Sequence, residues 1–342
     1  MLNFDNDYSE GAHPLILQRL QERNLIKQIG YGYDEESKAA RELIKAACGL
    51  NNSKAEVFFL VGGTQTNMTV LDALLHKTQG VIAAHSGHIS VHEAGAVEST
   101  GHKVLTLAGK QGKLDAKAVA SYLQVFYADA NSEHMVQPGA VYLSQPTEYG
   151  TLYSKAELAA LHAVCQEYQI PLYIDGARLA YALASPFNDV TLPDLAQLCD
   201  AFYIGGTKCG ALLGEAVIFP QGAPRFFFTS VKQHGALLAK GFVVGTQFKV
   251  LFSDNLYTKI GTNAINLALD LSKILEDKGY ELYLPTKTNQ IFIILKKEQA
   301  RQLATKVALS FWEQLDVNHE VWRIAISWAT TKEQVAALVE VL

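Results

Sequence analysis

Apolar runs long enough to cross a membrane are missing from this chain of 342 residues. None approaches the roughly eighteen consecutive apolar residues that a membrane-spanning helix needs. An excess of basic charge is missing too, since the formal net charge is −5 and the pI is near 6.1, with acids and bases scattered along the chain. These two absences argue against a membrane protein and against electrostatic binding of nucleic acid.

Cysteine is equally scarce, with four residues at positions 48, 165, 199 and 209. They are too few and too widely spaced for a disulfide scaffold, and no C-x-x-C pair offers the spacing of a metal site. Free thiols in a reducing compartment are the simpler interpretation. The N-terminal stretch MLNFDNDYSEGAHP is polar and acidic and lacks the apolar core of a signal peptide. We therefore expect a protein of the cytoplasm.

Segments typical of strands and of helices alternate over residues 56–220, with a hydrophilic stretch at 110–138 between them. This alternation predicts an α/β fold with a mostly parallel sheet and helices on both faces. We expect an N-terminal arm over residues 1–14, a large domain over 15–245 and a small α+β domain over 246–342. A polar arm of this kind is most often a solvated tail.

Two charged side chains of opposite sign follow neighbouring apolar runs. PLYID ends at Asp175, and the run DAFYI is followed by two glycines, a threonine and Lys208. A lysine placed in this way after a buried strand suits a pocket better than solvent. Its ε-amine could form a Schiff base with an aldehyde, while the carboxylate could keep a pyridine nitrogen protonated. The pair suggests pyridoxal phosphate as the cofactor.

A glycine turn lies between the strand-like EVFFLV and an amphipathic segment. Gly62 and Gly63 allow a tight turn, and Thr64 could cap the helix that follows. The first N–H groups of such a helix form an anion site, because the helix dipole adds to their hydrogen bonds. Phosphate binding is therefore one interpretation, and an ordinary turn before a helix is the other.

Four histidines lie close together in the sequence, at positions 85, 88, 92 and 102. His88 and His92 are four residues apart and could share a helix face, as metal ligands do. HISVHEAG lacks the glutamate beside the first histidine that H-E-x-x-H requires, so we expect no metal. An imidazole stacked on a flat cofactor is the better use of His88, and a histidine bonded at a helix start is the ordinary alternative.

Polar residues also follow the strand-like GAVYLS. Ser154 and Glu157 have the spacing of a capping box, which fixes the start of the next helix. Gln145, Thr147 and Glu148 therefore lie beyond the C-terminal end of a strand, where open α/β sheets build their sites.

In this order, VGGTQTN, HEAG, YIDGARL, GGTKCG and RIAISWAT make the chain resemble the threonine aldolase and β-eliminating lyase family of fold-type I pyridoxal phosphate enzymes. The resemblance implies that Arg323 binds the substrate carboxylate together with Asn6, which stands where many relatives have serine. It also implies a set of cofactor-binding residues, which are Gly63, Thr64 and Gln65 at the phosphate, His88 over the ring, Asp175 at the pyridine nitrogen, Arg178 beside the phenolic oxygen and Lys208 in covalent linkage.

The chain departs from this family at one point. Many members carry a histidine near the substrate hydroxyl in an Asn-Thr-His turn, whereas this chain has PTEYG with Glu148. A carboxylate at that place could still take a proton from a β-hydroxyl. We therefore expect Lys208, His88 and Glu148 to be the catalytic residues.

The resemblance implies cleavage of L-threonine, L-allo-threonine or related β-hydroxy-α-amino acids to glycine and an aldehyde. β-Elimination on another amino acid needs the same cofactor machinery and is the alternative, and a non-catalytic scaffold of the same fold is a third hypothesis. The resemblance also implies a homodimer or homotetramer. Tyr31, Lys232 or Lys240 could then reach a cofactor phosphate across the interface.

Overall fold

The computed structural model describes residues 2–51 and 53–342, and its centre is a sheet of seven strands. The five strands β7, β6, β5, β3 and β4 run parallel, and β8 runs antiparallel to its neighbours β7 and β2. The expected α/β fold with a mostly parallel sheet is confirmed. In spatial order the strands are β2 (Glu56–Leu60), β8 (Glu215–Phe219), β7 (Ala201–Gly205), β6 (Leu172–Asp175), β5 (Gln137–Ser144), β3 (Gln79–Ala84) and β4 (Val104–Leu107).

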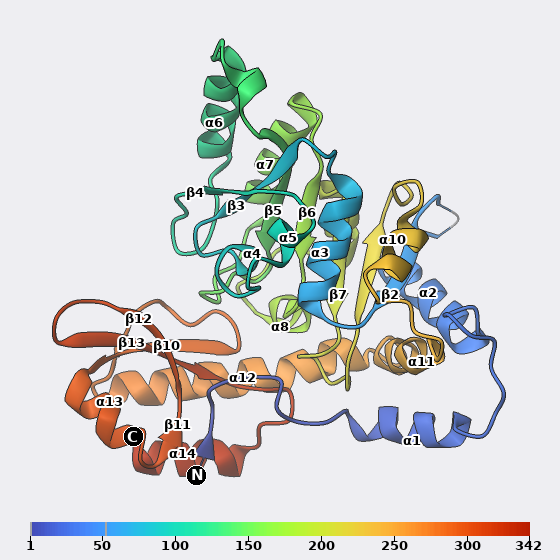
Figure 1. Ribbon diagram of the computed structural model, residues 1–342. Coiled ribbons are helices and arrows are strands. Elements are labelled where there is room, and N and C mark those ends of the chain that lie inside the picture. Colours follow the sequence, from blue (N-terminus) through green and yellow to red (C-terminus); the bar gives the residue numbers. More distant parts are fainter. Residues whose placement is uncertain (1, 52) are drawn as a thin grey trace.

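The two faces of this sheet pack into separate apolar cores, because successive residues of a strand point to opposite sides. Leu143 and Ile174 belong to the core that includes α7 (Lys155–Glu167). Tyr142 and Tyr173 belong to the other core, under α3 (Gly63–Leu74), which lies in front of the sheet in Figure 1. Burial on both faces explains why β6 and β7 are almost wholly apolar up to their last residues.

A helix lies in the hydrophilic stretch where the sequence analysis placed no element. This helix, α6, begins after Asp115, whose carboxylate accepts the amide of Lys117. Its buried residues Val119, Leu123 and Phe126 recur at helical spacing and form its inward face. The bounds of the helices up to residue 251 not yet given are α1 (Pro14–Arg23), α2 (Glu35–Ala47), α4 (His88–Val91), α5 (Ala96–Ser99), α6 itself (Ala116–Ala128), η1 (Ser132–His134), α8 (Leu179–Ala184), α9 (Leu192–Leu198), α10 (Phe227–Gln233) and α11 (Phe242–Leu251).

The C-terminal part is built on a four-stranded antiparallel sheet, which confirms the smaller α+β unit. The long helix α12 packs against α8 of the large part and against α14 of the small part (Figure 1). The predicted boundary near residue 245 falls inside α11, and the division itself stays a prediction. The elements are α12 (Leu256–Asp277), β9 (Glu281–Leu282), β10 (Gln290–Lys296), α13 (Lys297–Leu303), β12 (Ser310–Gln314), β13 (His319–Ala325) and α14 (Lys332–Val341).

The N-terminal arm is not a solvated tail, contrary to the expectation from its polarity. Its first residue lies outside the described residues, but β1 (Leu2–Asn3) pairs in parallel with β11 (Val307–Ala308). Phe4 is buried, and its carbonyl accepts the amide of Ala325 at 2.8 Å. The arm is thus held by backbone hydrogen bonds to the small part, and it runs from there to the large sheet.

Among residues 2–51 and 53–342, no helix combines the length and the apolar character that crossing a membrane requires.

Candidate active site

The candidate site lies at the C-terminal ends of three adjacent parallel strands. Asp175 is the last residue of β6, Lys208 follows β7 by three residues, and Glu148 follows β5 by four. Ser144 at the end of β5 is in register with Asp175, so these strand ends are level with each other. A pocket of about 550 Å³ opens here, and its lining includes His88, Glu148, Arg178, Lys208 and Arg323. Parallel sheets characteristically place ligand sites at this edge.

Asp175 is buried in a cluster of hydrogen-bond donors. Its Oδ2 accepts the hydroxyl of Tyr142 at 2.7 Å and Nδ2 of Asn67 at 2.9 Å, and its Oδ1 accepts the amide of Ala177 at 2.9 Å. Burial acts to raise the pKa of Asp175, but the neighbouring His88 and the hydrogen bonds outweigh burial, so the pKa lies below its ordinary value. The ionised form of Asp175 is therefore favoured at the end of β6.

Lys208 lies on the pocket wall, in a loop that a buried glutamate holds. Glu215 accepts the amide of Gly206 at 3.0 Å and the hydroxyl of Thr207 at 2.8 Å. The carbonyl of Lys208 itself accepts the hydroxyl of Tyr181 at 2.6 Å. Burial first, and then the positive charge of Arg178, lowers the pKa of Lys208. A lowered pKa favours the neutral amine, which is the nucleophilic form.

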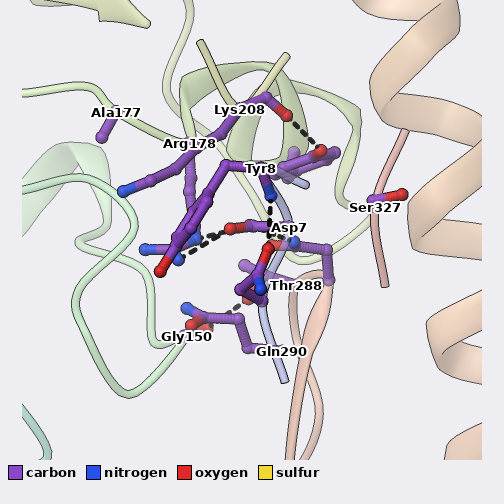
Figure 2. A network of polar contacts seen from close by, with 12 residues as sticks. Asp7, Tyr8, Gly150, Ala177, Arg178, Lys208, Thr288, Gln290 and Ser327 are labelled. Carbon is purple, nitrogen blue, oxygen red and sulfur yellow. Dashed lines mark hydrogen bonds and ion pairs between the residues drawn. The ribbon is translucent and has the colours of Figure 1, made fainter. Parts of the chain in front are cut away.

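Arg178 forms a two-pronged ion pair with Asp7 of the N-terminal arm. Its Nε and Nη2 donate to the two carboxylate oxygens at 2.7 and 2.9 Å, and Figure 2 shows the two groups facing each other. Asn289 donates a further hydrogen bond to Asp7 at 2.8 Å. Burial acts to raise the pKa of Asp7, but Arg178 outweighs it and lowers the pKa to about 2. The N-terminal arm thus supplies a negative charge, the Asp7 carboxylate, to Arg178 on the pocket wall.

His88 begins the short helix α4 and is fixed from two sides. Its Nδ1 lies 2.7 Å from Oε1 of the buried Glu93, and its backbone amide donates to Oε1 of Glu148 at 2.9 Å. Ligand atoms of His88, Glu93 and Asp175 lie within 4.8 Å of one another, as they would around a metal ion. Asn67 already bridges the two carboxylates with its Nδ2, at 2.7 Å from Glu93 and 2.9 Å from Asp175. The closeness of these groups is therefore explained by hydrogen bonding.

Glu148 is a buried carboxylate on the pocket wall. Its Oε1 accepts the hydroxyl of Ser144 at 2.6 Å in addition to the amide of His88. Burial raises the pKa of Glu148, and the hydrogen bond from Ser144 acts in the opposite direction. Both hydrogen bonds end on Oε1, which leaves Oε2 for a group in the pocket.

Arg323 comes from β13 of the small part and reaches the same pocket. Its guanidinium donates to Oε1 of Gln290 at 3.0 Å and to the carbonyl of Asp5 at 2.9 Å, and it lies 5.2 Å from the ring centre of Trp312. Burial first, and then the positive charge of Arg178, lowers the pKa of Arg323 to about 10. Its Nε is buried with no partner among the described residues, so one donor stays available for an acceptor.

Asn6 does not reach the pocket wall formed by the described residues, whereas Tyr8 does. Its Oδ1 accepts the amide of Tyr8 at 3.0 Å and the hydroxyl of Ser9 at 2.8 Å, and its Nδ2 donates to Asp5 at 2.6 Å. In this structure the side chain shapes the turn of the arm.

Gly63, Thr64 and Gln65 form the first turn of α3, as the sequence predicted for the phosphate turn. The prediction that Thr64 caps the helix was wrong, because the N-cap is Gly62 and no side chain caps this end. Gly62 has an extended backbone, and the helix begins one residue before Thr64. The uncapped amides suit a phosphate group.

Two further details of this turn fit a bound cofactor. A Cβ added to Gly63 would lie 3.2 Å from the hydroxyl of Tyr203, so a side chain here would press against the wall of the site. Gln65 donates to the carbonyl of His234 at 2.9 Å, while its Oε1 is buried without a partner among the described residues. The same helix carries Asn67, which reaches Asp175. The residues present therefore fit pyridoxal phosphate.

Five residues of the site were not found from the sequence. Asp7 belonged to a polar cluster in the arm, and Glu93 lay in the quoted HEAG, but neither motif shows its spatial partner. The others are Asn67, which lies on α3, and Tyr142 and Ser144, which lie on β5. The alternation of β5 could have placed Tyr142 and Ser144 on one face, two residues apart.

The fold is that of the fold-type I pyridoxal phosphate enzymes. The aspartate aminotransferase of Thermus thermophilus, in a doubly mutated form, shares the fold at a TM-score of 0.72 and 16% identity, covering 100% of this chain and 92% of its own. The profile of the beta-eliminating lyase family matches residues 26–308. The chain belongs to this family, and it is an enzyme of the threonine aldolase type.

Individual relatives support the same assignment. A threonine aldolase of Leishmania major is 42% identical, with a TM-score of 0.95 and coverage of 100% of this chain and 98% of its own. The low specificity L-threonine aldolase of a Pseudomonas species is 29% identical over 309 residues, which are 89% of this chain and 87% of the relative. The corresponding protein of Saccharomyces cerevisiae is 24% identical over 85% of this chain and 74% of its own length.

Proposed function

We propose that this protein binds pyridoxal phosphate and cleaves L-threonine, L-allo-threonine or related β-hydroxy-α-amino acids into glycine and an aldehyde. One observation carries the proposal: a lysine with a lowered pKa, Lys208, and a buried carboxylate with a raised pKa, Glu148, face one pocket with Arg323. Several relatives are low specificity L-threonine aldolases, which favours carbon–carbon cleavage over β-elimination.

The cofactor would be held by side chains from several elements. Lys208 would bind it covalently, Asp175 would pair with its pyridine nitrogen, and the first turn of α3 would bind its phosphate. His88 would stack on the ring, and Arg178 would lie beside the phenolic oxygen. When bound, pyridoxal phosphate supplies an electron-accepting ring that takes up the electron pair left at the α-carbon. The low pKa of Asp175 suits this partnership, because an ionised carboxylate keeps the pyridine nitrogen protonated.

The substrate carboxylate would bind to Arg323. A guanidinium can donate two parallel hydrogen bonds to a carboxylate, and its rigid plane fixes the orientation of the amino acid. The buried and unpartnered Nε of Arg323 offers a donor for this purpose, and Trp312 supports the plane of the group. Asn6 would assist from the arm after a rearrangement of its turn. Orientation matters because it selects which bond of the α-carbon breaks.

Glu148 would act as the base that removes the proton from the β-hydroxyl of the substrate. Its Oε2 is the atom free to accept this proton, since Ser144 and His88 occupy Oε1. The raised pKa brings the carboxylate closer to the neutral range in which a general base works best. Proton removal and cleavage together convert the β-carbon into the carbonyl carbon of the aldehyde, and the α-carbon is then protonated to give glycine.

We further propose a cytoplasmic homodimer or homotetramer, and the division of the chain near residue 245. An apolar cavity of about 590 Å³ between α2, β2 and α10 supports the assembly, because its lining includes the exposed Tyr31, Tyr33, Phe226 and Phe228. Lys232 lies 5.0 Å from the ring centre of Tyr31. Exposed apolar clusters of this kind mark subunit contacts.

The test is a product assay on purified protein supplied with pyridoxal phosphate. We expect glycine and acetaldehyde from threonine, and benzaldehyde with glycine from phenylserine. Pyruvate and ammonia from serine, without glycine from either β-hydroxy amino acid, would replace the proposal with β-elimination. The variant Lys208→Ala should lose the yellow colour of the bound cofactor. A protein that cannot be coloured by pyridoxal phosphate would favour the non-catalytic scaffold.

A further inference from the structure

Two hydroxyl groups lie between the carboxylates of Glu148 and Asp175. Ser144 Oγ donates to Oε1 of Glu148 at 2.6 Å, and the hydroxyl of Tyr142 donates to Oδ2 of Asp175 at 2.7 Å. The two hydroxyl oxygens are 3.2 Å apart. A continuous chain of polar contacts therefore joins the proposed base to the proposed partner of the cofactor ring.

The backbone fixes this chain. Tyr142 and Ser144 are alternate residues of β5 and so point to the same face of the sheet. The parallel register places Ser144 beside Asp175 and Tyr142 beside Tyr173. Tyr142, Glu148 and Asp175 are all buried, and Ser144 is 9% exposed. Water cannot easily replace any of these contacts.

The number of protons available to these hydrogen bonds depends on whether Glu148 is ionised or protonated. With both carboxylates ionised, Ser144 gives its single proton to Glu148 and Tyr142 gives its single proton to Asp175. The contact between the two hydroxyl oxygens then contains no proton. Once Glu148 is protonated and the protonated oxygen is the one that faces Ser144, the carboxyl proton can point to Ser144, and the Ser144 proton is free to turn toward Tyr142. Three contacts then share three protons, and each is a hydrogen bond.

We infer that Ser144 and Tyr142 are positioning residues that couple the protonation of Glu148 to the hydrogen bonding of Asp175. Glu148 takes up the substrate proton on Oε2, and a half-turn of the carboxyl group would then bring this proton to Ser144, complete the row of hydrogen bonds and strengthen the donation from Tyr142 to Asp175. The carboxylate at the cofactor ring would thus be stabilised at the moment when the ring takes up charge. This role rests on the proposed function of Glu148, whereas the coupling itself is a property of the protein.

Other titratable groups surround these two hydroxyls and also influence the pKa of Glu148. Glu148 is faced by Asp175 from β6, by His88 from α4 and by Arg178 from the start of α8, and the phenols of Tyr149 and Tyr153 lie near it. The pocket adds a further set of titratable groups, which are Tyr8, His92, Lys208, Glu313 and Arg323. The substitutions proposed below leave all of these groups in place, so a shift between variants reports the hydroxyl chain.

The test follows the protonated carboxyl band of Glu148 by infrared difference spectroscopy of the holoenzyme across pH, with Glu148→Gln used to assign the band. Ser144→Ala removes a donor to the ionised carboxylate, so the titration midpoint should rise by about one pH unit. Tyr142→Phe removes the oxygen that favours the protonated state, so the midpoint should fall by roughly half a pH unit. In the double variant the titration midpoint should equal that of Ser144→Ala, because without the Ser144 hydroxyl the Tyr142 hydroxyl no longer contacts a group bonded to Glu148.

Tyr173→Phe is the matched control. Its hydroxyl is equally buried beside Tyr142 but donates to Asn67 at 2.8 Å, outside the chain. This variant should keep the wild-type midpoint. A midpoint in Tyr142→Phe that equals wild type, or shifts that simply add in the double variant, would overturn the inference.

A second measurement needs no change at Tyr142. The absorption of the bound cofactor should change slightly with pH at the Glu148 midpoint, and this step should vanish in Glu148→Gln and shrink in Ser144→Ala. A step of unchanged size in Ser144→Ala would show that only direct charge–charge interaction couples the two carboxylates, which would overturn the inference. Absence of glycine in the product assay would remove the proposed function and leave these midpoints to be judged separately.

Discussion

The ion pair between Asp7 and Arg178 should be a main anchor of the N-terminal arm. In Asp7→Asn one oxygen is replaced by an NH₂ group, which would face the donors of Arg178 and Asn289. The guanidinium of Arg178 would lose its counter-charge in a site where its own side chain is 10% exposed. Both changes act in the same direction, toward release of the arm.

The magnitude follows from burial and from the pKa of Asp7. Removing one partner of a buried ion pair costs about 3–5 kcal/mol of folding free energy. A separate estimate comes from linkage: a folded pKa of about 2 against about 3.9 in an unfolded chain corresponds to roughly 2.5 kcal/mol. Because the folded pKa is depressed, this stabilisation is present in full above about pH 4 and is lost as the pH falls toward 2.

The assay is urea unfolding of wild type and Asp7→Asn at one protein concentration and several pH values. We expect a lower unfolding midpoint for the variant at pH 7 and convergence of the two proteins as the pH falls. Asp5→Asn is the matched control in the same arm, since the Asp5 carboxylate bonds only the neighbouring Asn6 side chain in the described residues. A difference below about 1 kcal/mol at pH 7 between Asp7→Asn and wild type would refute the reasoning, because surface changes are of that size.

Three further predictions concern the chemistry. Glu148→Gln should lower kcat by about 10²–10⁴-fold while the cofactor stays bound, as steady-state kinetics and the absorption spectrum will show; unchanged kcat would remove the base. Arg323→Lys should raise KM for threonine more than it lowers kcat, because a point charge replaces a two-pronged donor, and an unaltered KM would place the carboxylate elsewhere. Gly63→Val should weaken pyridoxal phosphate binding, measured by equilibrium dialysis, since a Cβ there meets Tyr203 at 3.2 Å; wild-type affinity would contradict the phosphate turn.

The alternation of strand-like and helix-like segments over residues 56–220 predicted the α/β fold with a mostly parallel sheet. Strands such as β6 and β7 are short, apolar and followed by polar residues, and such strands separated by helices are typical of a parallel sheet that is buried on both faces. The same pattern placed Asp175, Lys208 and Glu148 at one edge of the sheet. The helix α6 was missed because the polar residues on both sides of it, at 110–115 and 129–134, made the whole stretch look hydrophilic, although the helix itself is largely apolar.

The partners of the site residues could not be predicted in the same way. Asp7 and Arg178 are 171 residues apart, and nothing in an isolated polar arm indicates which buried cation will receive it. The cap of α3 was placed at Thr64 because threonine is a good capping side chain, whereas the helix begins at Gly63 with Gly62 in the N-cap position. Ser144 ends a largely apolar strand, and the sequence does not show that its hydroxyl donates a hydrogen bond to Glu148.

The central claim is that this site breaks the bond between the α- and β-carbons of a β-hydroxy amino acid. The most direct measurement is the product balance of the holoenzyme with each of the four threonine stereoisomers. The account predicts glycine and acetaldehyde in equal amounts from L-threonine or L-allo-threonine, and none in Lys208→Ala. Ammonia and 2-oxobutanoate in place of glycine and acetaldehyde would contradict it.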